Sequence, residues 1–209
     1  MRIAAGWLAT FLILLCTAVM SAAFTNGPPP EYSGAPPEPD CHACHDGNPR
    51  NLDGQLQILD APLLYREGRT YRITIRITSS QTSAAPSPKW GFQLTAVRTA
   101  TGEGAGTFVD VSGENTTIVT GINDPTRRYI EQTSAGTHAG TRDAVEWKVD
   151  WTAPGAGVGG VDFHAAGIAA NGNGSTTGDY VYAATVASDD TTTGIPATTW
   201  GELKRRYRR

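Results

Sequence analysis

Two cysteines and two histidines fall within the pentapeptide CHACH. Cys41, His42, Cys44 and His45 form this cluster, in a chain that has 3 cysteines and 4 histidines in all. The spacing C-x-x-C-H places two thiols where each can add to a vinyl group of one porphyrin, with the next histidine held beneath the iron. The motif therefore predicts one covalent haem c, with Cys41 and Cys44 forming the thioethers and His45 as the proximal iron ligand.

Two other chemistries fit part of the same pattern. A C-x-x-C pair also forms a dithiol or disulfide, but catalytic pairs of this kind begin a helix in a βαβ unit, which this sequence does not predict. Zinc accepts cysteine and histidine ligands, yet a structural zinc site usually needs a second ligand pair, and no cysteine follows Cys44. A structural disulfide or a metal site therefore stays open as the alternative to haem.

The sixth position of a haem iron has few candidate ligands. Both methionines, Met1 and Met20, lie in the first residues of the chain, which we expect to be removed. His42 is tethered beside the thioether bonds, so His164 and His138 remain as the candidate distal ligands. Ligation by one of them predicts a low-potential bis-histidine haem; without it the iron is five-coordinate or water-bound.

The first residues have the composition of an export signal. A positive residue, an apolar run over about 4–19 and the small residues 21–23 precede Phe24. This order is typical of a secretory signal peptide, so we expect residues 1–23 to be cleaved. We expect the mature protein in the periplasm, on the cell surface or outside a bacterial cell. No second apolar stretch of spanning length follows, so no transmembrane anchor is expected in the mature chain.

The charge balance limits the partners. The chain has 17 basic and 20 acidic side chains, and five of the basic ones lie in the final KRRYRR. An acidic body without a basic stripe disfavours nucleic acid and favours a basic redox protein through long-range attraction. No nucleophile, base or carboxylate grouping indicates an enzyme, so we expect an electron carrier.

Alternation of apolar and polar residues predicts an all-β fold. Segments 71–77, 90–96 and 145–151 place apolar side chains, including three tryptophans that we expect in the core, at every second position. Shorter runs lie near 106–111, 116–120, 128–132, 161–166 and 180–186. Joined by Gly, Ser, Pro and Asn clusters, these segments predict an Ig-like antiparallel β-sandwich of about eight or nine strands over residues 55–190.

The residues on either side of this domain have other compositions. Residues 24–54 are rich in proline and glycine and are expected to be irregular. Residues 191–209 are expected to form a linker and a short basic helix, which Thr199 and Glu202 would cap. Within the sandwich, alternation along 161–166 sends His164 to the outer face of its sheet, where a haem packed on the sandwich would meet it.

One loop has part of a calcium-binding pattern. In NGNGSTTGD the side chains of Asn171, Asn173, Ser175 and Asp179 fall at positions 1, 3, 5 and 9 of a calcium loop. Thr176 stands at position 6, where the pattern requires glycine, and Tyr182 stands at position 12, where it requires glutamate. The sequence therefore favours a tight connection between strands.

Several runs together resemble a known family. They are TNGPPPEYSGAPPEPDCHACHDG, WGFQLTAV, VDWTAPGAG and FHAAGIAANGNGSTTGDYVY. These resemble the exported bacterial domains called choice-of-anchor V, related to the Reeler type of β-sandwich, from Gly27 to about Val186. The resemblance implies one sandwich preceded by a haem-type motif. It also implies a histidine in a Y-x-x-H-T strand, where this chain has Gln132, so that His138 would take that role. Members often end in a surface anchor, whereas this chain ends in KRRYRR.

Overall fold

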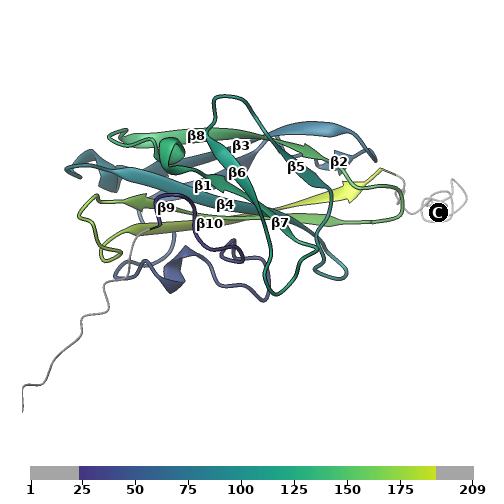
Figure 1. Cartoon of the computed structure of the whole chain (residues 1–209), viewed down its shortest axis with the longest axis horizontal. Coiled ribbons are helices and arrows are strands. Elements are labelled where there is room, and N and C mark those ends of the chain that lie inside the picture. The colour runs from purple at the N-terminus through teal and green to yellow at the C-terminus, as the bar shows by residue number, and fades with distance from the viewer. Residues whose placement is uncertain (1–23, 192–209) are drawn as a thin grey trace, which may run out of the picture.

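The computed structural model describes residues 24–191. The expected signal peptide and C-terminal helix lie outside the described residues. Ten strands form two packed sheets, and the helical elements between 24 and 191 are three short 3-10 turns (Figure 1). The prediction of an all-β sandwich is confirmed, with ten strands in place of eight or nine.

The smaller sheet has four antiparallel strands. Its order is β1 (Gly54–Leu59), β3 (Thr70–Ser79), β8 (Asp143–Thr152) and β5 (Thr107–Asp110). Its outer face is in water and has ladders of opposite charges. Arg72 pairs with Asp150 at 2.8 Å and Arg76 with Glu146 at 3.6 Å. Such exposed pairs contribute little stability, about 0–1 kcal/mol each.

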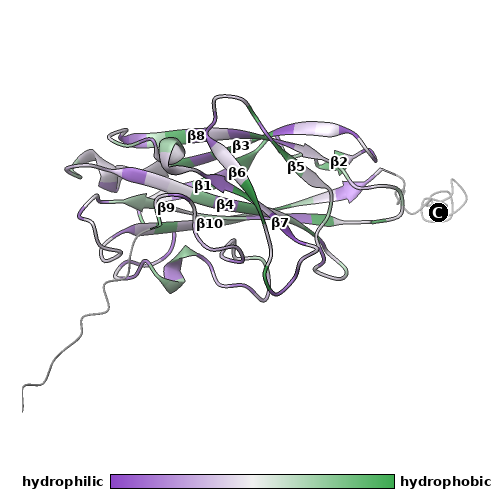
Figure 2. Cartoon of the chain, in the orientation of Figure 1, coloured by the Kyte–Doolittle hydropathy of each residue, from purple (hydrophilic) through white to green (hydrophobic). Residues whose placement is uncertain are grey.

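The larger sheet has six strands. Its order is β2 (Leu64–Tyr65), β10 (Tyr180–Asp190), β9 (Val161–Ala170), β4 (Lys89–Arg98), β7 (Arg128–Gln132) and β6 (Thr116–Thr120). All neighbours are antiparallel except β2 and β10, which are parallel. Apolar and polar residues alternate along many strands (Figure 2), as expected when one face of each strand packs inward.

The core between the sheets is built around the tryptophans. Trp90 is 1% exposed, and Trp147 and Trp151 are 0% exposed, which confirms their predicted place in the core. Trp151 meets the rings of Tyr65 and Phe163 edge-on, at centroid distances of 5.7 and 4.8 Å. Burying each such side chain stabilises the fold by a few kcal/mol, so this aromatic cluster is a large part of the core.

Part of the outer face of the six-stranded sheet is also covered. Gln93 and Thr95 point away from the core on β4, yet both are 0% exposed. The cover is the N-terminal segment, which we define as residues 24–53, drawn in purple and dark blue along this sheet in Figure 1. Alternation alone predicts a solvated face here, because the covering residues have no periodic pattern. This covered face carries the motif.

Candidate functional site

Hydrogen bonds from a buried glutamine fix the N-terminal segment on the sheet. The backbone N–H of Tyr32 donates to Oε1 of Gln93 at 2.7 Å, and Nε2 of Gln93 donates to the carbonyl of Pro29 at 3.1 Å. Buried amides need such partners in place of water. Gln93 therefore joins β4 to the stretch that leads into the motif.

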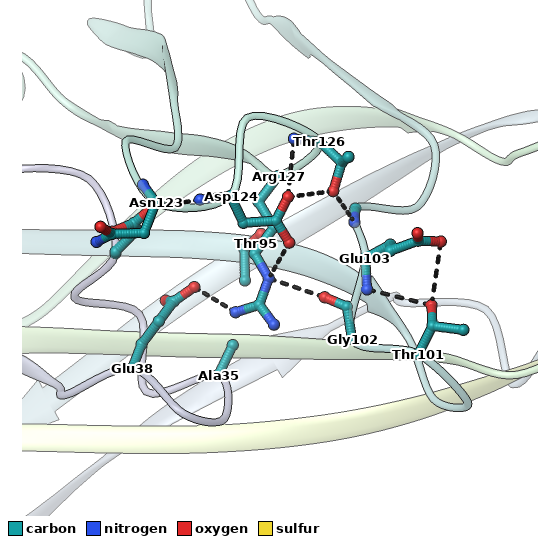
Figure 3. A network of polar contacts seen from close by, with 12 residues as sticks. Ala35, Glu38, Thr95, Thr101, Gly102, Glu103, Asn123, Asp124, Thr126 and Arg127 are labelled. Atoms are coloured by element: carbon teal, nitrogen blue, oxygen red, sulfur yellow. Dashed lines mark hydrogen bonds and ion pairs between the residues drawn. The ribbon is translucent and has the colours of Figure 1, made fainter.

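A buried ion pair also holds the N-terminal segment, at a point nearer to the motif in the sequence. The carboxylate of Glu38 accepts from the guanidinium of Arg127 and from the hydroxyl of Tyr129 (Figure 3 shows the guanidinium). The side chains of Glu38 and Arg127 are 7% and 6% exposed. Arg127 also donates to the carbonyl oxygens of Pro36 and Gly102, at 2.9 and 2.8 Å. Because a buried charge is costly without such partners, the network fixes the segment against the turn before β7.

The motif itself forms one compact turn. η1 (Cys41–Ala43) begins after Asp40, whose Oδ1 accepts the backbone N–H of His42 at 2.9 Å. The backbone N–H of His45 then donates to the carbonyl of Cys41 at 2.9 Å. The turn therefore brings the first and last residues of C-x-x-C-H close together, as one porphyrin would require.

The imidazole of His45 is held by a buried carboxylate from far along the chain. Its Nδ1 lies 2.7 Å from Oδ2 of Asp179, whose side chain is 1% exposed. Oδ1 of Asp179 accepts the backbone N–H of Asn171 at 2.9 Å, so both carboxylate oxygens have partners. Because a carboxylate accepts hydrogen bonds, this contact places a proton on Nδ1 and leaves Nε2 available to a metal.

The loop before Asp179 uses its own side chains to hold its backbone. Oδ1 of Asn171 accepts the N–H of Asn173, Oδ1 of Asn173 accepts that of Ser175, and Oγ of Ser175 accepts that of Thr177, at 2.9, 2.7 and 3.2 Å. This is the pattern of successive side-chain turns. The loop is thus the tight strand connection that the sequence favours, and it positions Asp179 against His45.

A hollow with mostly apolar walls, which we call the apolar hollow, opens beside the motif. Its walls are rings and aliphatic groups from the N-terminal segment and the sheet: Phe24, Pro28, Pro29, Tyr32 and Ile168. Cys41, Cys44 and His45 also line it. Its empty volume, open solvent included, is about 470 Å³.

The sheet side of the apolar hollow depends on a glycine. Gly91 faces outward on β4 opposite Ile168 of β9, and a Cβ added to it would come within 3.0 Å of Nε2 of Gln132. Pairing of β4 with β7 ends at Gln93, and beyond it Oε1 of Gln132 accepts the N–H of Phe92 at 2.7 Å. The glycine thus leaves room for the amide of Gln132, and we call the surface that Gly91 and Gln132 form in the wall of the apolar hollow the glycine cradle.

The two thiols have different surroundings. Both are free; Cys44 is exposed and Cys41 is partly buried. Burial, and after it the carboxylate of Asp40, raises the pKa of the Cys41 thiol to about 12. Thiols that act in disulfide exchange have lowered pKa values, because the thiolate is the nucleophile. The environment of Cys41 thus opposes a role of this thiol in catalytic disulfide exchange and does not bear on a structural disulfide.

The zinc alternative finds no ligand cluster. Within residues 24–191, no group of three or more His, Cys, Asp or Glu side chains is placed to hold a metal ion. His45 is committed through Nδ1 to Asp179 and offers one nitrogen. A protein-only tetrahedral zinc site needs four ligands, which this part of the chain does not bring together.

His164 takes the predicted face of its strand but does not line the apolar hollow. Its neighbour Phe163 is in the core, so His164 points to the outer face, where its Nδ1 lies 3.0 Å from Oγ1 of Thr185. Burial lowers the pKa of His164. The residue of β9 that lines the apolar hollow is Ile168, four positions on and roughly 13 Å along the strand.

The other two histidines face elsewhere. The ring of His138 packs against Trp147 of the core, with centroids 4.9 Å apart. Its Nε2 is buried and has no hydrogen-bond partner among residues 24–191. Nε2 of His42 lies 2.9 Å from the carbonyl oxygen of Asn48. The structure thus brings Cys41 and Cys44 to the hollow together with a single histidine, His45.

The two thiols, the imidazole of His45 and the walls of the apolar hollow fit a covalent haem. Two thiols, one oriented imidazole with Nε2 available, apolar walls and a glycine cradle meet at one place. Cys41 and Cys44 would hold such a group, and His45 would be its iron ligand. When bound, it would supply one-electron redox chemistry.

Sequence reasoning missed the residues that support this site. Asp179 enters the sequence argument only through the partial calcium pattern, which contains no signal of a bond to His45. Gly91 interrupts the alternation of KWGFQLTAV, and a glycine inside a strand is a known sign of close approach by another group. Gln132 enters only through the family resemblance, and the structure places it in the wall of the apolar hollow.

No helix within residues 24–191 is long and apolar enough to cross a membrane. No protein-family model and no curated protein matches the chain. Similar solved structures include the reeler domain of human F-spondin, 24% identical over 68% of this chain and 92% of that one with a TM-score of 0.41. A cohesin module from Clostridium perfringens is 10% identical over 66% and 96% of the two chains, with a TM-score of 0.43. Since these identities and TM-scores are low, the fold assignment depends on the strand pairing of the chain itself.

Proposed function

We propose that the protein is an exported monohaem c-type cytochrome that passes single electrons between proteins. The observation that carries the proposal is the imidazole of His45, fixed through Nδ1 by buried Asp179 and lining the same apolar hollow as Cys41 and Cys44. A C-x-x-C-H motif that served as a disulfide would need neither this orientation of the histidine nor an apolar hollow beside it.

The surroundings suit exchange of electrons with a basic partner. The N-terminal segment has five acidic side chains and one arginine, Arg50. Cys44 is exposed, so a group attached to it would lie near the surface. Opposite charges speed protein encounters, and salt screens them. Electron exchange with a basic redox protein should therefore slow as ionic strength rises; an exchange rate that does not depend on salt would remove this part of the proposal.

The test is a pair of visible absorption spectra, oxidised and reduced, of protein exported from a host with a cytochrome c maturation system. The wild type should show a haem spectrum that persists after acid extraction of non-covalent haem. Cys44→Ser should keep at most one thioether and show a shifted spectrum, and Cys41→Ser/Cys44→Ser should lose the colour on extraction. A colourless wild-type protein made under the same conditions would contradict the proposal.

One observation favours a second function, that of a secreted or cell-surface binding module. A groove separates the proline-rich stretch near Pro30 from the turn that contains Ile122, whose side chain is 72% exposed. Exposed apolar side chains in a groove are a common sign of a partner site. Under this alternative the cysteine pair is a structural disulfide, and blocked thiols in a colourless protein would support it.

A further inference from the structure

A second hollow adjoins the apolar hollow and has a different lining. We call it the polar hollow; its empty volume, open solvent included, is about 880 Å³. The side chains of Ser87, Lys89, Thr137 and Ser175 line it but do not line the apolar hollow. His45 and Ile168 line both. The two hollows are therefore adjoining parts of one site, with His45 between them.

Lys89 is placed on the sheet beside the glycine cradle. It precedes Gly91 by two residues on β4, so both face outward, and it pairs with Ala170 where Gly91 pairs with Ile168. Residues two apart on a strand are separated by roughly 6.5 Å, and a lysine side chain spans about that length. A ligand seated over Gly91 therefore has the ammonium group of Lys89 within reach.

The ammonium group of Lys89 has no carboxylate partner in the described structure. It forms no ion pair or side-chain hydrogen bond with any residue of 24–191. The carboxylate in the same hollow, that of Asp179, is committed to His45 and to the backbone N–H of Asn171. The Lys89 side chain is half-buried, and its ammonium group is in contact with solvent. Lys89, beside Ser87 and Ser175, can therefore pair with an anionic group of a ligand without first breaking an ion pair.

We infer that Lys89 binds the propionate carboxylates of the haem and so sets the direction in which the porphyrin lies. This inference depends on the proposed function. A haem has its vinyl groups and its propionates on opposite edges of the ring. The thiols of Cys41 and Cys44 line only the apolar hollow, Lys89 lines only the polar hollow, and His45 lines both. The order of thiols, imidazole and cation is the order of vinyl groups, iron and propionates across a haem.

The hydroxyls of the polar hollow extend the same site. Ser87 precedes β4 and Ser175 is in the loop that follows β9, so both lie at the end of the sheet where Lys89 pairs with Ala170, and both line the polar hollow with Lys89. Hydroxyl groups donate hydrogen bonds to carboxylates, and a lysine adds a charge-assisted one. The carboxylate edge would thus be bound by Lys89 and two serines, while the apolar walls contact the rest of the ring.

The chain provides a matched control for a chemical test. Residues 24–191 contain two lysines, Lys89 and Lys148. Lys148 is exposed on β8, on the outer face of the other sheet. Acetylation with an N-hydroxysuccinimide ester, read by peptide mass spectrometry, measures how accessible each amine is. We compare the haem-loaded wild type with the haem-free Cys41→Ser/Cys44→Ser protein.

The expected result is that Lys89 is acetylated in the haem-free protein and loses most of that reactivity in the haem-loaded protein, while Lys148 reacts equally in both. Haem that is attached while Lys89 stays equally reactive would overturn this inference and leave the proposed function intact. Absence of covalent haem in the wild type would overturn the proposed function, and this inference with it.

A second measurement uses variants that already carry haem. Lys89→Gln removes a positive charge near the iron, which stabilises the more positive, oxidised state, so we expect the reduction potential to fall. We also expect the potential to depend on pH differently, because the propionates lose a cation that favours their ionised form and their pKa values rise. Lys89→Arg should retain the wild-type potential, as should Lys148→Gln. Equal potentials in Lys89→Gln and Lys148→Gln across pH would contradict the inference.

Discussion

His45 and Asp179 are joined by a 2.7 Å hydrogen bond across 134 residues of sequence. The bond links the motif turn to the loop that enters β10, and it fixes which nitrogen of the imidazole faces the apolar hollow. Metal-ligating histidines usually donate their second N–H to a carboxylate or carbonyl, which fixes the ring and increases its basicity as a ligand. The pair is therefore the strongest structural argument for His45 as an iron ligand.

Asp179→Asn should keep the haem and raise its reduction potential. The amide oxygen still accepts from Nδ1 but has no charge, so the imidazole donates less electron density and stabilises oxidised iron less. Potentiometric titration of haem-loaded protein measures the shift. Asp150→Asn, on the opposite sheet, is the matched control and should leave the potential unchanged. Equal potentials for Asp179→Asn and the wild type would show that the bond does not tune the iron.

Histidine substitutions should separate the candidate distal ligands. Because neither His164 nor His138 lines the apolar hollow, alanine at either position should leave the haem spectrum unchanged. Gln132 does line it, so Gln132→His should convert the iron to six-coordinate low spin, visible by electron paramagnetic resonance and in the reduced spectrum. A spectrum altered by His164→Ala would instead establish His164 as the distal ligand.

Gly91→Leu should prevent the haem from packing without preventing its attachment. The thioethers need only the thiols, but the leucine would occupy the cradle and displace Gln132. Overpacking of this kind costs about 1–3 kcal/mol. We expect the thermal midpoint of the haem-loaded variant to fall by several degrees, about what that loss implies.

Gly155→Leu is the matched control, because nothing lies within 4 Å of a Cβ added at Gly155. Calorimetry of both variants with the haem attached makes the comparison. A Gly91→Leu protein that is as stable as Gly155→Leu, with an unaltered haem spectrum, would show that the haem lies elsewhere.

The strands and the core could be predicted from the sequence because their signals are local. Period-two alternation in 71–77 and 145–151 reports burial of one face, and the structure places those residues in the core. The covered outer face could not be predicted in this way, since Gln93 and Thr95 are polar and their cover is an aperiodic proline-rich segment. Asp179 could not be paired with His45 because no local pattern encodes a contact between distant loops.

The ion pair of Glu38 and Arg127 should contribute far more to the free energy of unfolding than exposed ion pairs do. Glu38→Gln leaves the guanidinium buried with weaker compensation, and breaking a buried pair in this way costs about 3 kcal/mol. Glu146→Gln, which breaks an exposed pair with Arg76, should cost less than about 1 kcal/mol. Urea unfolding measures both.

Hydrogen exchange provides the second readout for this pair. Backbone amides near Pro36 should exchange faster in Glu38→Gln and not in Glu146→Gln, because the N-terminal segment is then held less firmly. Equal losses of stability in the two variants would mean that the buried network does not hold the segment.

Glu131→Gln should stabilise the protein in a pH-dependent way. Burial raises the pKa of Glu131 to about 7, although a hydrogen bond from Gln93 opposes the shift. The folded state then holds a proton that the unfolded chain releases above its ordinary pKa of 4.5, so stability declines as pH rises from that value to about 7 and is level above it.

The glutamine cannot ionise, so Glu131→Gln should exceed the wild type by on the order of 2 kcal/mol at pH 8 and match it near pH 4. Urea unfolding at the two pH values measures the difference. Glu67→Gln, at an exposed position, should show no such difference. A gain for Glu131→Gln that is the same at both pH values would rule out ionisation as its cause.

The most direct test of the haem assignment is the intact mass of the chain exported beside cytochrome c maturation machinery, measured under denaturing conditions. We expect a mass greater than that of the polypeptide by one haem, and no such increase for Cys41→Ser/Cys44→Ser. A wild-type mass equal to that of the bare polypeptide, or to the polypeptide with one disulfide, would contradict it.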